Sequence, residues 1–482
     1  MSALLALLPC AVVIVAVLGL HRSGLVAASA AFAVTAALWL SGVFAPVDAM
    51  ALPHAVEDGL LLTSLVGSVI VAGLLYVEVC RRVGSLDAIS RVIAALQLDP
   101  PKAAVVLVAG VGVMLESLTG FGVSLLVTVP LMLAMFERRQ TIALGLIGMS
   151  LMPWGALAVS ALLGAKLAGM PVPDLAGAFV WTSGPVAAVI PLVCLVFVSG
   201  VTPGSILFAL AAGAALVGGI VLTNLAIGVE VAGVGGGLAV LALAVATAPD
   251  RQRALRAITA PPLALLGLLV AGVVAQKLLV PVLAQAGFAP VVGTSRVGYA
   301  LMTSPGIALL LVAAFGALAW RRAVHRGSEP LASHVATRAW RSLLTIAVFL
   351  SMARLLVETG GIGALAGLLT QAGEYAAVAI VSGLAGVGAY VTGSAVPAAA
   401  LFMPSAAATG QSFGHLNLFA ALQHSAAGHT AMASLPIISI LLAGLPNRTL
   451  ADEREALRRG LLLAGLWMSL VVASGWVWLT FG

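Results

Sequence analysis

Charged side chains are scarce in this 482-residue chain, because Asp, Glu, Lys and Arg together make up only 8% of it. A soluble domain carries about 25% charged residues, so a soluble enzyme, a nucleic-acid-binding protein and a disordered chain are all excluded. Hydrophobic residue types reach 62%, in long runs without the alternation of a transmembrane β-barrel. We therefore expect an all-α, polytopic membrane protein in contact with the lipid bilayer.

Cysteines and nucleotide-binding motifs are equally sparse. Cys10, Cys80 and Cys194 are isolated, without the spacing of a metal or redox site, and we expect them to be buried. Neither a Walker motif nor an HExxH sequence is present. The first absence argues against ATP-driven transport, and together they predict no metal site and no resident cofactor.

Hydropathy divides the chain into about a dozen membrane spans, each of which needs about 20 apolar residues. Two further apolar stretches, 103–136 and 375–413, are too long for one crossing and contain a glycine-rich break. We interpret each as a re-entrant hairpin of two half-helices, whose broken backbone must lie inside the protein or beside a watery cavity. The expected spans are 3–20, 24–44, 59–79, 140–163, 176–198, 205–222, 231–248, 259–283, 298–320, 342–359, 416–445 and 460–480.

The basic residues test this layout, because Lys and Arg mark the cytoplasmic side of a membrane protein. With twelve spans and two same-side hairpins, 19 of the 23 Lys and Arg fall on one side, and both termini are predicted to be outside. These residues are Arg22, Arg81, Arg82, Arg91, Lys102, Arg138, Arg139, Arg251, Arg253, Arg256, Arg321, Arg322, Arg326, Arg338, Arg341, Arg448, Arg454, Arg458 and Arg459.

The order of elements repeats with opposite orientation. Three spans, a hairpin, a broken span and another span form a first repeat in 1–198, and the same order recurs in 259–482. Two linking spans occupy 199–258, and the broken spans are 140–163 and 416–445. Interrupted segments at matching positions of inverted halves are typical of transporters, whose substrate site lies at the bilayer midplane.

Glu116 is the leading candidate for chemistry, about 13 residues into the first hairpin and therefore near the membrane midplane. Desolvation favours the protonated form of a buried carboxyl, so Glu116 could bind and release a coupling proton. The alternative is a structural glutamate that caps the broken backbone at 117–119.

The two breaks share a Thr-Gly pair at an offset of 273 residues. Half-helix N-termini carry partial positive charge, so such breaks suit a substrate carboxylate, which nearby hydroxyls would also bind. The alternative is close helix packing of small residues. The expected binding residues at the hairpin tips are Thr119, Gly120, Gly122, Ser124, Thr392, Gly393 and Ser394.

Arg354 and two histidines complete the candidates. Arg354 lies inside a span, where it must pair with Glu358 at i+4, with Glu116, or with a substrate carboxylate. His424 and His429 lie in the last broken span, and either one could relay protons or bind substrate. The alternative for the histidines is an interhelical hydrogen bond.

Two polar segments flank the spans. Residues 84–98 have apolar side chains at helical spacing and predict an interfacial amphipathic helix. Residues 450–459 predict a charged loop with a short helical turn, in which Glu455 pairs with Arg459.

Four motifs of the chain resemble the lactate permease family of bacterial monocarboxylate transporters. Glu116, Gly120, Phe121 and Gly122 match the family pattern at the first hairpin, whereas Ala395 stands where the family has an aspartate in the second. The motifs are MLESLTGFGVS (114–124), SLMPWGALAVS (150–160), VTGSAVPAAALF (391–402) and LFAALQHSAAGHTAMAS (418–434).

This resemblance implies a secondary transporter of the bacterial inner membrane, with opposed hairpins and an elevator-like motion. It implies proton-coupled uptake of a small carboxylate, lactate or glycolate, and leaves a homodimer open as the assembly. A sodium-coupled anion carrier of the same architecture is the first alternative, since backbone carbonyls at the breaks could hold sodium. An intramembrane enzyme that uses Glu116, His424 and His429 as acid–base groups is a remote one.

Overall fold

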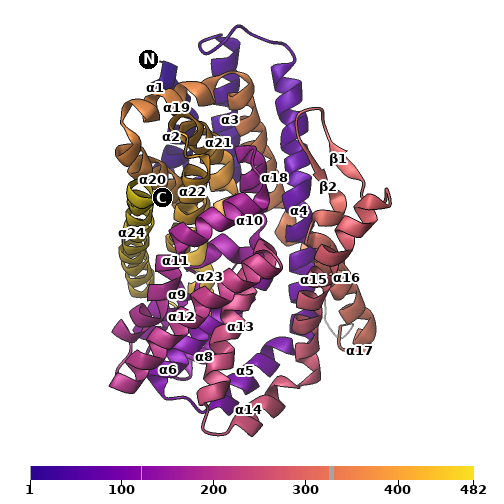
Figure 1. Ribbon diagram of the computed structural model, residues 1–482, viewed down its shortest axis with the longest axis vertical. Coiled ribbons are helices and arrows are strands. Elements are labelled where there is room, and N and C mark those ends of the chain that lie inside the picture. The colour runs from indigo at the N-terminus through magenta and orange to yellow at the C-terminus, as the bar shows by residue number, and fades with distance from the viewer. Residues whose placement is uncertain (1, 121, 325–329) are drawn as a thin grey trace.

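The computed structural model describes residues 2–120, 122–324 and 330–482, which fold almost entirely into helices (Figure 1). Phe121 of the first-hairpin motif and Arg326 of the basic set lie outside the described residues. Among the described residues, nine helices are long and apolar enough to cross a membrane, or eleven if two bent pairs each count as one span. The prediction of an all-α polytopic membrane protein is therefore confirmed.

The first half of the chain runs from α1 to α13. Its helices are α1 (Ser2–Ala6), α2 (Leu8–Ile14), the π-helical turn η1 (Val15–Gly19), α3 (Gly24–Leu40), α4 (Ala51–Val83), α5 (Ser85–Leu96), α6 (Pro100–Val105), the π-helical η2 (Val106–Gly112), α7 (Val113–Thr119), α8 (Val123–Leu133), α9 (Arg138–Gly148), the 3-10 turn η3 (Met152–Trp154), α10 (Gly155–Ala168), α11 (Val172–Val196), α12 (Pro203–Ala226) and α13 (Val229–Thr247).

The second half runs from α14 to α24 and includes one short sheet. Its elements are α14 (Arg251–Ile258), the 3-10 turn η4 (Pro261–Leu263), α15 (Ala264–Gln285), β1 (Val291–Gly293), β2 (Gly298–Ala300), the 3-10 turn η5 (Leu301–Thr303), α16 (Gly306–Ala319), α17 (Arg321–Val324), α18 (Leu331–Glu358), α19 (Gly361–Gln371), α20 (Glu374–Thr392), α21 (Ala395–Phe413), α22 (Leu416–Thr430), the 3-10 turn η6 (Ala431–Ala433), α23 (Leu435–Ala443) and α24 (Leu450–Phe481).

The predicted breaks are present. The span expected at 140–163 bends by 49° between α9 and α10, and the span expected at 416–445 bends by 43° between α22 and α23. The helix expected at 84–98 is α5. α8 packs back along η2, and α21 packs back along α20, so both 103–136 and 375–413 fold as helical hairpins.

The prediction of a loop at 450–459 is wrong, because α24 begins at Leu450 and is continuous through the charged stretch. Thr449 and Asp452 form a reciprocal capping box, which satisfies the first amide groups of the helix. The expected pair is present inside this helix, with Arg459 Nε 2.6 Å from Glu455 Oε1. The prediction from hydropathy also did not include helices α14 and α19 or the antiparallel β1–β2 pair.

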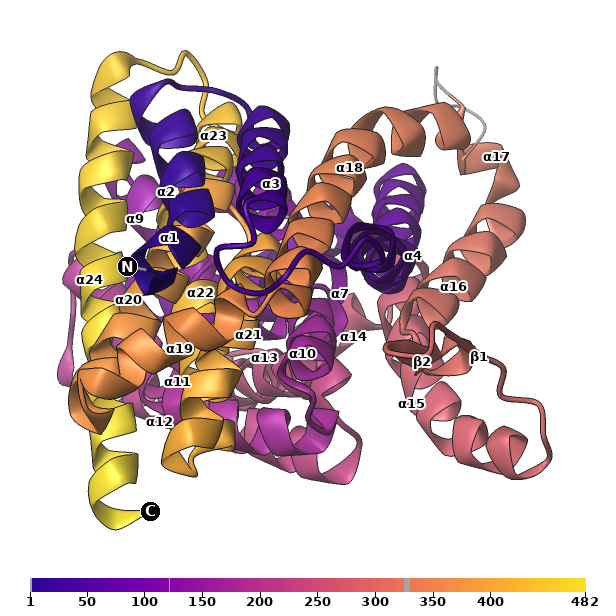
Figure 2. The same cartoon turned by 90° about the horizontal axis from the view of Figure 1, so that it is seen from above.

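The helices form two groups of unequal size. In Figure 2, α15, α16, α17 and the β1–β2 pair stand to one side, and α4 and α18 lie between them and the larger group. α4 packs against both α16 and α18, so it joins the two groups. Apolar side chains such as Leu278 and Leu311 are exposed on α15 and α16, as expected for helices that face lipid or a second protein.

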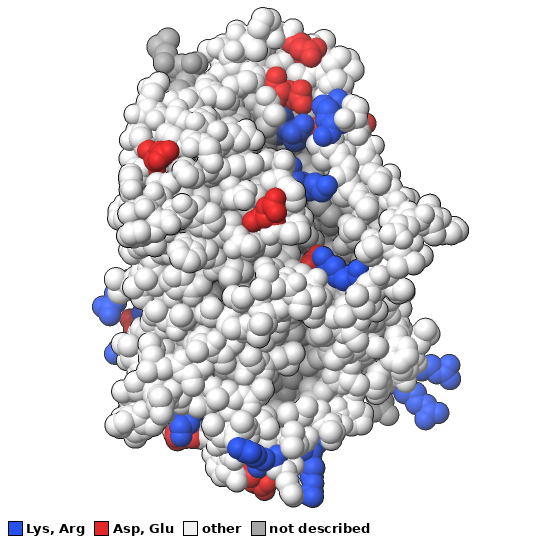
Figure 3. Space-filling view, in the orientation of Figure 1, with Lys and Arg blue, Asp and Glu red and all other residues white. Residues whose placement is uncertain are grey.

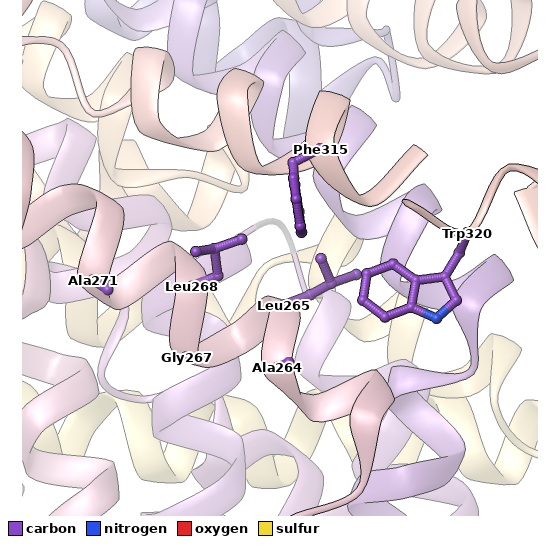
Figure 4. Close-up of a pocket in the computed structure, with 7 residues that line it drawn as sticks. All are labelled: Ala264, Leu265, Gly267, Leu268, Ala271, Phe315 and Trp320. Atoms are coloured by element: carbon purple, nitrogen blue, oxygen red, sulfur yellow. The ribbon is translucent and has the colours of Figure 1, made fainter. Parts of the chain in front are cut away.

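A recess of about 390 Å³ lies between α15 and α16 in this smaller group. Figure 4 shows Phe315 and Trp320 over Leu265 and Leu268, with no polar side chain among the labelled residues apart from the Trp320 indole. This recess therefore lacks the convergent polar groups of a site for a small polar ligand.

The basic side chains gather at one end of the molecule. On the face in Figure 3, Lys and Arg cluster at the lower end, over α14 and α17, and a second set of basic and acidic side chains lies in the upper half. The C-terminal end of α24 and the first helix both lie in the upper half of Figure 1. The orientation itself, with the basic end cytoplasmic and both termini outside, stays a prediction.

The orientation predicts opposite labelling of two cysteine variants. Asp48→Cys, in the exposed loop between α3 and α4, should react with a membrane-impermeant maleimide in intact cells. Gln252→Cys, exposed on α14, should react only after the membrane is permeabilised. The three native cysteines are buried, so the unmodified chain is the background control. Labelling of Gln252→Cys alone in intact cells would reverse the orientation.

Candidate functional site

The first hairpin turns at two glycines in the left-handed backbone region. α7 ends at Thr119, Gly120 follows with φ of +66°, and Gly122 has φ of +74° before α8 returns. A Cβ atom on Gly120 would lie 2.5 Å from the Cβ of Ala156, so only glycine fits there. The Gly120 backbone therefore rests directly on the start of α10.

The second hairpin has a matching turn. α20 ends at Thr392, and Gly393 has φ of +77° before Ser394 caps α21. A Cβ atom on Gly393 would lie 2.6 Å from the ring of Pro436 in α23. Each hairpin tip therefore packs against the second segment of the broken span that follows it, α10 in the first case and α23 in the second.

The break between α9 and α10 has an uncommon backbone. Ala156, Leu157 and Ala158 have φ values of 50°, 53° and 55°, although none of them is glycine. A side chain in this left-handed region costs about 1–2 kcal/mol per residue. Such strain persists only where the surroundings over-determine the conformation, as the contact of Ala156 with Gly120 does here.

A small cavity lies where the two hairpin tips and this break meet; we call it the hairpin cavity. Glu116 and Gly120 come from the first hairpin, residues 394–396 from the second, and Gly155 and Ser160 from α10. The hairpin cavity measures about 30 Å³, which is far below the usual volume of a small-molecule site, about 300–1,000 Å³. A ligand the size of a small-molecule substrate therefore requires the hairpin tips to move apart.

Glu116 is the acidic group of the hairpin cavity, and its side chain is almost fully buried at 2% exposure. Its Oε2 accepts a hydrogen bond from Ser124 Oγ at 2.9 Å, and its Oε1 accepts one from the Gly122 N–H at 3.3 Å. Both donors belong to the first turn of α8, so Glu116 caps the returning half-helix. The capping contact expected at 117–119 is therefore made on the other side of the turn.

The hydroxyl groups at the tips divide into occupied and free ones. Thr119 donates to the Leu115 carbonyl at 2.6 Å, and Thr392 donates to the Gly388 carbonyl at 2.7 Å, so neither hydroxyl hydrogen faces the hairpin cavity. Ser394 Oγ accepts from the Val396 N–H at 3.3 Å and keeps its own hydrogen for another partner. Ser160 is 97% buried, lines the hairpin cavity and makes no hydrogen bond through its side chain to the described residues.

Ser160 is the polar group that the sequence reasoning missed. It is the last residue of the motif 150–160, and nothing in its spacing distinguishes it from other small residues of α10. Only the packing of α10 against both tips gives it a role. Among the described residues, no group of three or more His, Cys, Asp or Glu side chains could hold a metal ion.

The two histidines tie the broken spans together and do not line the hairpin cavity. His424 donates through Nε2 to the Pro153 carbonyl at 3.1 Å, and His429 donates through Nδ1 to the Ser150 carbonyl at 2.6 Å. These carbonyls lie at the break between α9 and α10, where helical partners are lost. The expected interhelical hydrogen bond is therefore confirmed, and a substrate-binding role for His424 stays a prediction.

Arg354 also lies away from the hairpin cavity. Its Nη2 donates to Asp58 Oδ2 at 2.9 Å and to Glu358 Oε1 at 3.3 Å. Asp58 is fully buried and also accepts from Arg296 Nε at 3.1 Å, which connects α4, α18 and the β1–β2 turn. The expected pair with Glu358 is confirmed, and the full set of partners favours a structural role for Arg354, outside the hairpin cavity.

Comparison with known proteins adds one finding. A family model described as L-lactate permease matches residues 2–253 and 271–474, which is nearly the whole chain. No curated protein matches the sequence.

Replacing Gly120 tests the close approach of the first tip to α10. Gly120→Ala should lower the free energy of unfolding by about 1–3 kcal/mol, because the new methyl group overpacks the contact with Ala156. Gly383→Ala is the control, since a Cβ atom there meets nothing within 4 Å. Thermal melting of the purified proteins in detergent measures both, and equal melting temperatures would show that the tip does not rest on α10.

Replacing Arg354 separates a structural role from substrate binding. Arg354→Ala should cost about 1–3 kcal/mol of stability, because buried Asp58 loses one of its charged donors while Arg296 remains. The apparent substrate affinity of the folded fraction should not change. A weaker affinity at unchanged melting temperature would return Arg354 to the substrate site.

Proposed function

The chain belongs to the L-lactate permease family, and from this premise we propose that it is a proton-coupled carrier of lactate or glycolate. The observation that carries the proposal is the hairpin cavity, in which buried Glu116 meets the tips of both hairpins. An intramembrane carboxyl group is a functional residue by default, because isolated charge in hydrocarbon is costly.

The substrate carboxylate would bind at the tips through backbone N–H groups and free hydroxyls. The first turn of α8 presents the N–H of Gly122 and the hydroxyl of Ser124, and both currently bond to Glu116. Ser394 and Ser160 supply further hydroxyl groups on the opposite walls. The N-terminus of a half-helix favours an anion at this point.

Glu116 and the substrate then compete for the same donors, and this competition supplies a physical basis for symport. Two carboxylates that share one small site cannot both be ionised at low cost, so the bound substrate favours the protonated form of Glu116. Protonation in turn releases Gly122 and Ser124 to the substrate. The coupling is reciprocal, as linkage requires, and each ligand strengthens the binding of the other.

The inverted repeat is part of the proposal. It pairs 1–198 with 259–482, and 199–258 links them. In its support, each hairpin tip packs on the broken span that follows it, and each broken span contains a 3-10 turn, η3 or η6. Movement of the hairpins and broken spans as one unit would expose the hairpin cavity alternately to the two sides, in the manner of an elevator.

The static part of such a carrier would be built from the spans outside this unit. The expected scaffold comprises spans 3–20, 24–44, 259–283 and 298–320. The exposed apolar faces of α15 and α16 lie in this set and suit a homodimer contact or lipid. The carrier would reside in the bacterial inner membrane, with both termini outside.

Uptake of labelled substrates into proteoliposomes tests the function directly. Lactate and glycolate should accumulate under an imposed pH gradient. Short dicarboxylates should not, because the described lining of the hairpin cavity contains no cationic side chain to balance a second carboxylate. Accumulation driven by sodium alone would favour sodium coupling. Chemical conversion of the substrate would favour an enzyme.

Glu116→Gln tests the coupling role. The variant should lose accumulation driven by the pH gradient but keep lactate exchange at equal pH, because glutamine mimics the protonated carboxyl group. Glu374→Gln is the control, since Glu374 lies in the first turn of α20, outside the hairpin cavity. Normal proton-driven accumulation by Glu116→Gln would remove Glu116 from the mechanism.

A further inference from the structure

A second, larger cavity lies at the end of α10 that faces away from the hairpin cavity. It measures about 620 Å³, which is within the usual size of small-molecule sites, about 300–1,000 Å³. Its walls come from α10, α11, the α12–α13 turn, α15 and the segment around β2. We call it the vestibule. Its polar lining consists of Lys166, Asn224, Glu230, Lys277, Tyr299 and Thr303.

The vestibule is rich in positive charge for a site so far from the basic end. Lys166 and Lys277 line it, against Glu230 as the one acidic side chain among its described lining residues. Lys166 is exposed, and no described residue forms an ion pair or a hydrogen bond with it. The lysine side chain is a mobile point charge with three donors, suited to an anion that binds and then moves on.

Lys277 is held by a buried carboxylate. Its Nζ lies 2.5 Å from Glu230 Oε1, and the Glu230 side chain is only 3% exposed. The second oxygen of Glu230, Oε2, is buried and has no hydrogen-bond partner among the described residues. Lys277 itself is 39% exposed, so an incoming carboxylate can reach it while Glu230 stays in place.

One helix connects the vestibule to the hairpin cavity. Ser160 of α10 lines the hairpin cavity, whereas Leu162 and Lys166 of the same helix line the vestibule. Six residues separate Ser160 from Lys166, which corresponds to about 9 Å along a helix. In the upper half of Figure 3, basic side chains and their acidic neighbours lie along the seam between α10 and the group that contains α4 and α15.

We propose that the vestibule is a second carboxylate-binding site, in which Lys166 and Lys277 collect the substrate anion before it reaches the hairpin tips. The proposal rests on the proposed carrier function. The anion binds to Lys166 and to the exposed side of Lys277, where it competes with Glu230 for the ammonium group. It then moves along α10 to the hairpin cavity when the tips separate.

This arrangement predicts that two substitutions change the KM for lactate in opposite directions. Lys166→Gln removes an attractive charge and should raise the KM for lactate about threefold or more at low ionic strength, with an unchanged maximal rate. Glu230→Gln removes the competing carboxylate and should lower the KM. General damage to the fold cannot produce changes of opposite sign.

The measurement is initial uptake into right-side-out membrane vesicles under an imposed pH gradient. It is made at about 0.01 M and about 0.15 M ionic strength, between which the screening length falls from about 30 Å to about 8 Å. The effect of Lys166→Gln should shrink at the higher salt, and Lys166→Arg should restore the normal KM. Lys102→Gln is the control, because Lys102 pairs with Asp99 at 2.8 Å and belongs to the basic set predicted to be cytoplasmic.

A labelling experiment decides the charge of the vestibule independently of transport. Asn224→Cys should react faster with an anionic than with a cationic methanethiosulfonate. The ratio of these two rates is compared with the ratio for the same two reagents and a free thiol in solution. Lys166→Gln in the same chain should abolish this preference, and lactate should slow the anionic reaction.

The outcomes distinguish the two proposals. A normal KM for Lys166→Gln at low salt, in a chain that carries lactate, overturns the vestibule site and leaves the carrier function intact. The absence of any anion preference at Asn224→Cys overturns it as well. A chain that carries no lactate but shows the anion preference contradicts the carrier function and supports a vestibule that attracts anions.

Discussion

Backbone that stops being helical inside a membrane protein must find hydrogen bonds within the protein, because lipid supplies none. The centre of this molecule is organised by that constraint. Where the first hairpin turns, Glu116 accepts a hydrogen bond from the Gly122 N–H. At the break between α9 and α10, His424 donates to the Pro153 carbonyl and His429 donates to the Ser150 carbonyl. These three side chains are therefore explained first by the backbone groups they satisfy, and Glu116 is the one of the three that also lines the hairpin cavity.

The same constraint explains why the sequence predicted the hairpins well. The left-handed turns at the hairpin tips favour glycine, and Gly120, Gly122 and Gly393 are visible as glycine-rich interruptions of stretches too long for one span. The bend of the first broken span could be located because Pro153 and Gly155 interrupt it. The spacing of Thr449 and Asp452 is that of a capping box, so the sequence also contained a signal for the start of α24. The run of charged residues that follows was instead interpreted as a loop.

The partners of buried charges could not be predicted in the same way. Local spacing identified Glu358 for Arg354, but Asp58 is 296 residues away in the sequence, and only the packing of α4 on α18 brings it there. The short β1–β2 pair holds Arg296 against the same aspartate, and three-residue strands leave no periodic signal. Ser160 was missed for a related reason, because its importance depends on two hairpins that approach α10 from distant parts of the chain.

The hydrogen bonds at the first break have a consequence for the synthesis of the protein. The Pro153 carbonyl accepts its hydrogen bond from a histidine that lies 271 residues later in the chain, and the Ser150 carbonyl accepts one from a histidine 279 residues later. Gly428 is also synthesised late, and because it has no side chain the Pro153 ring can pack closely against the second broken span. While the ribosome is still translating the second half, the first half therefore stands in the bilayer with unsatisfied carbonyls. These two hydrogen bonds can therefore form only after residues 424–429 have been synthesised.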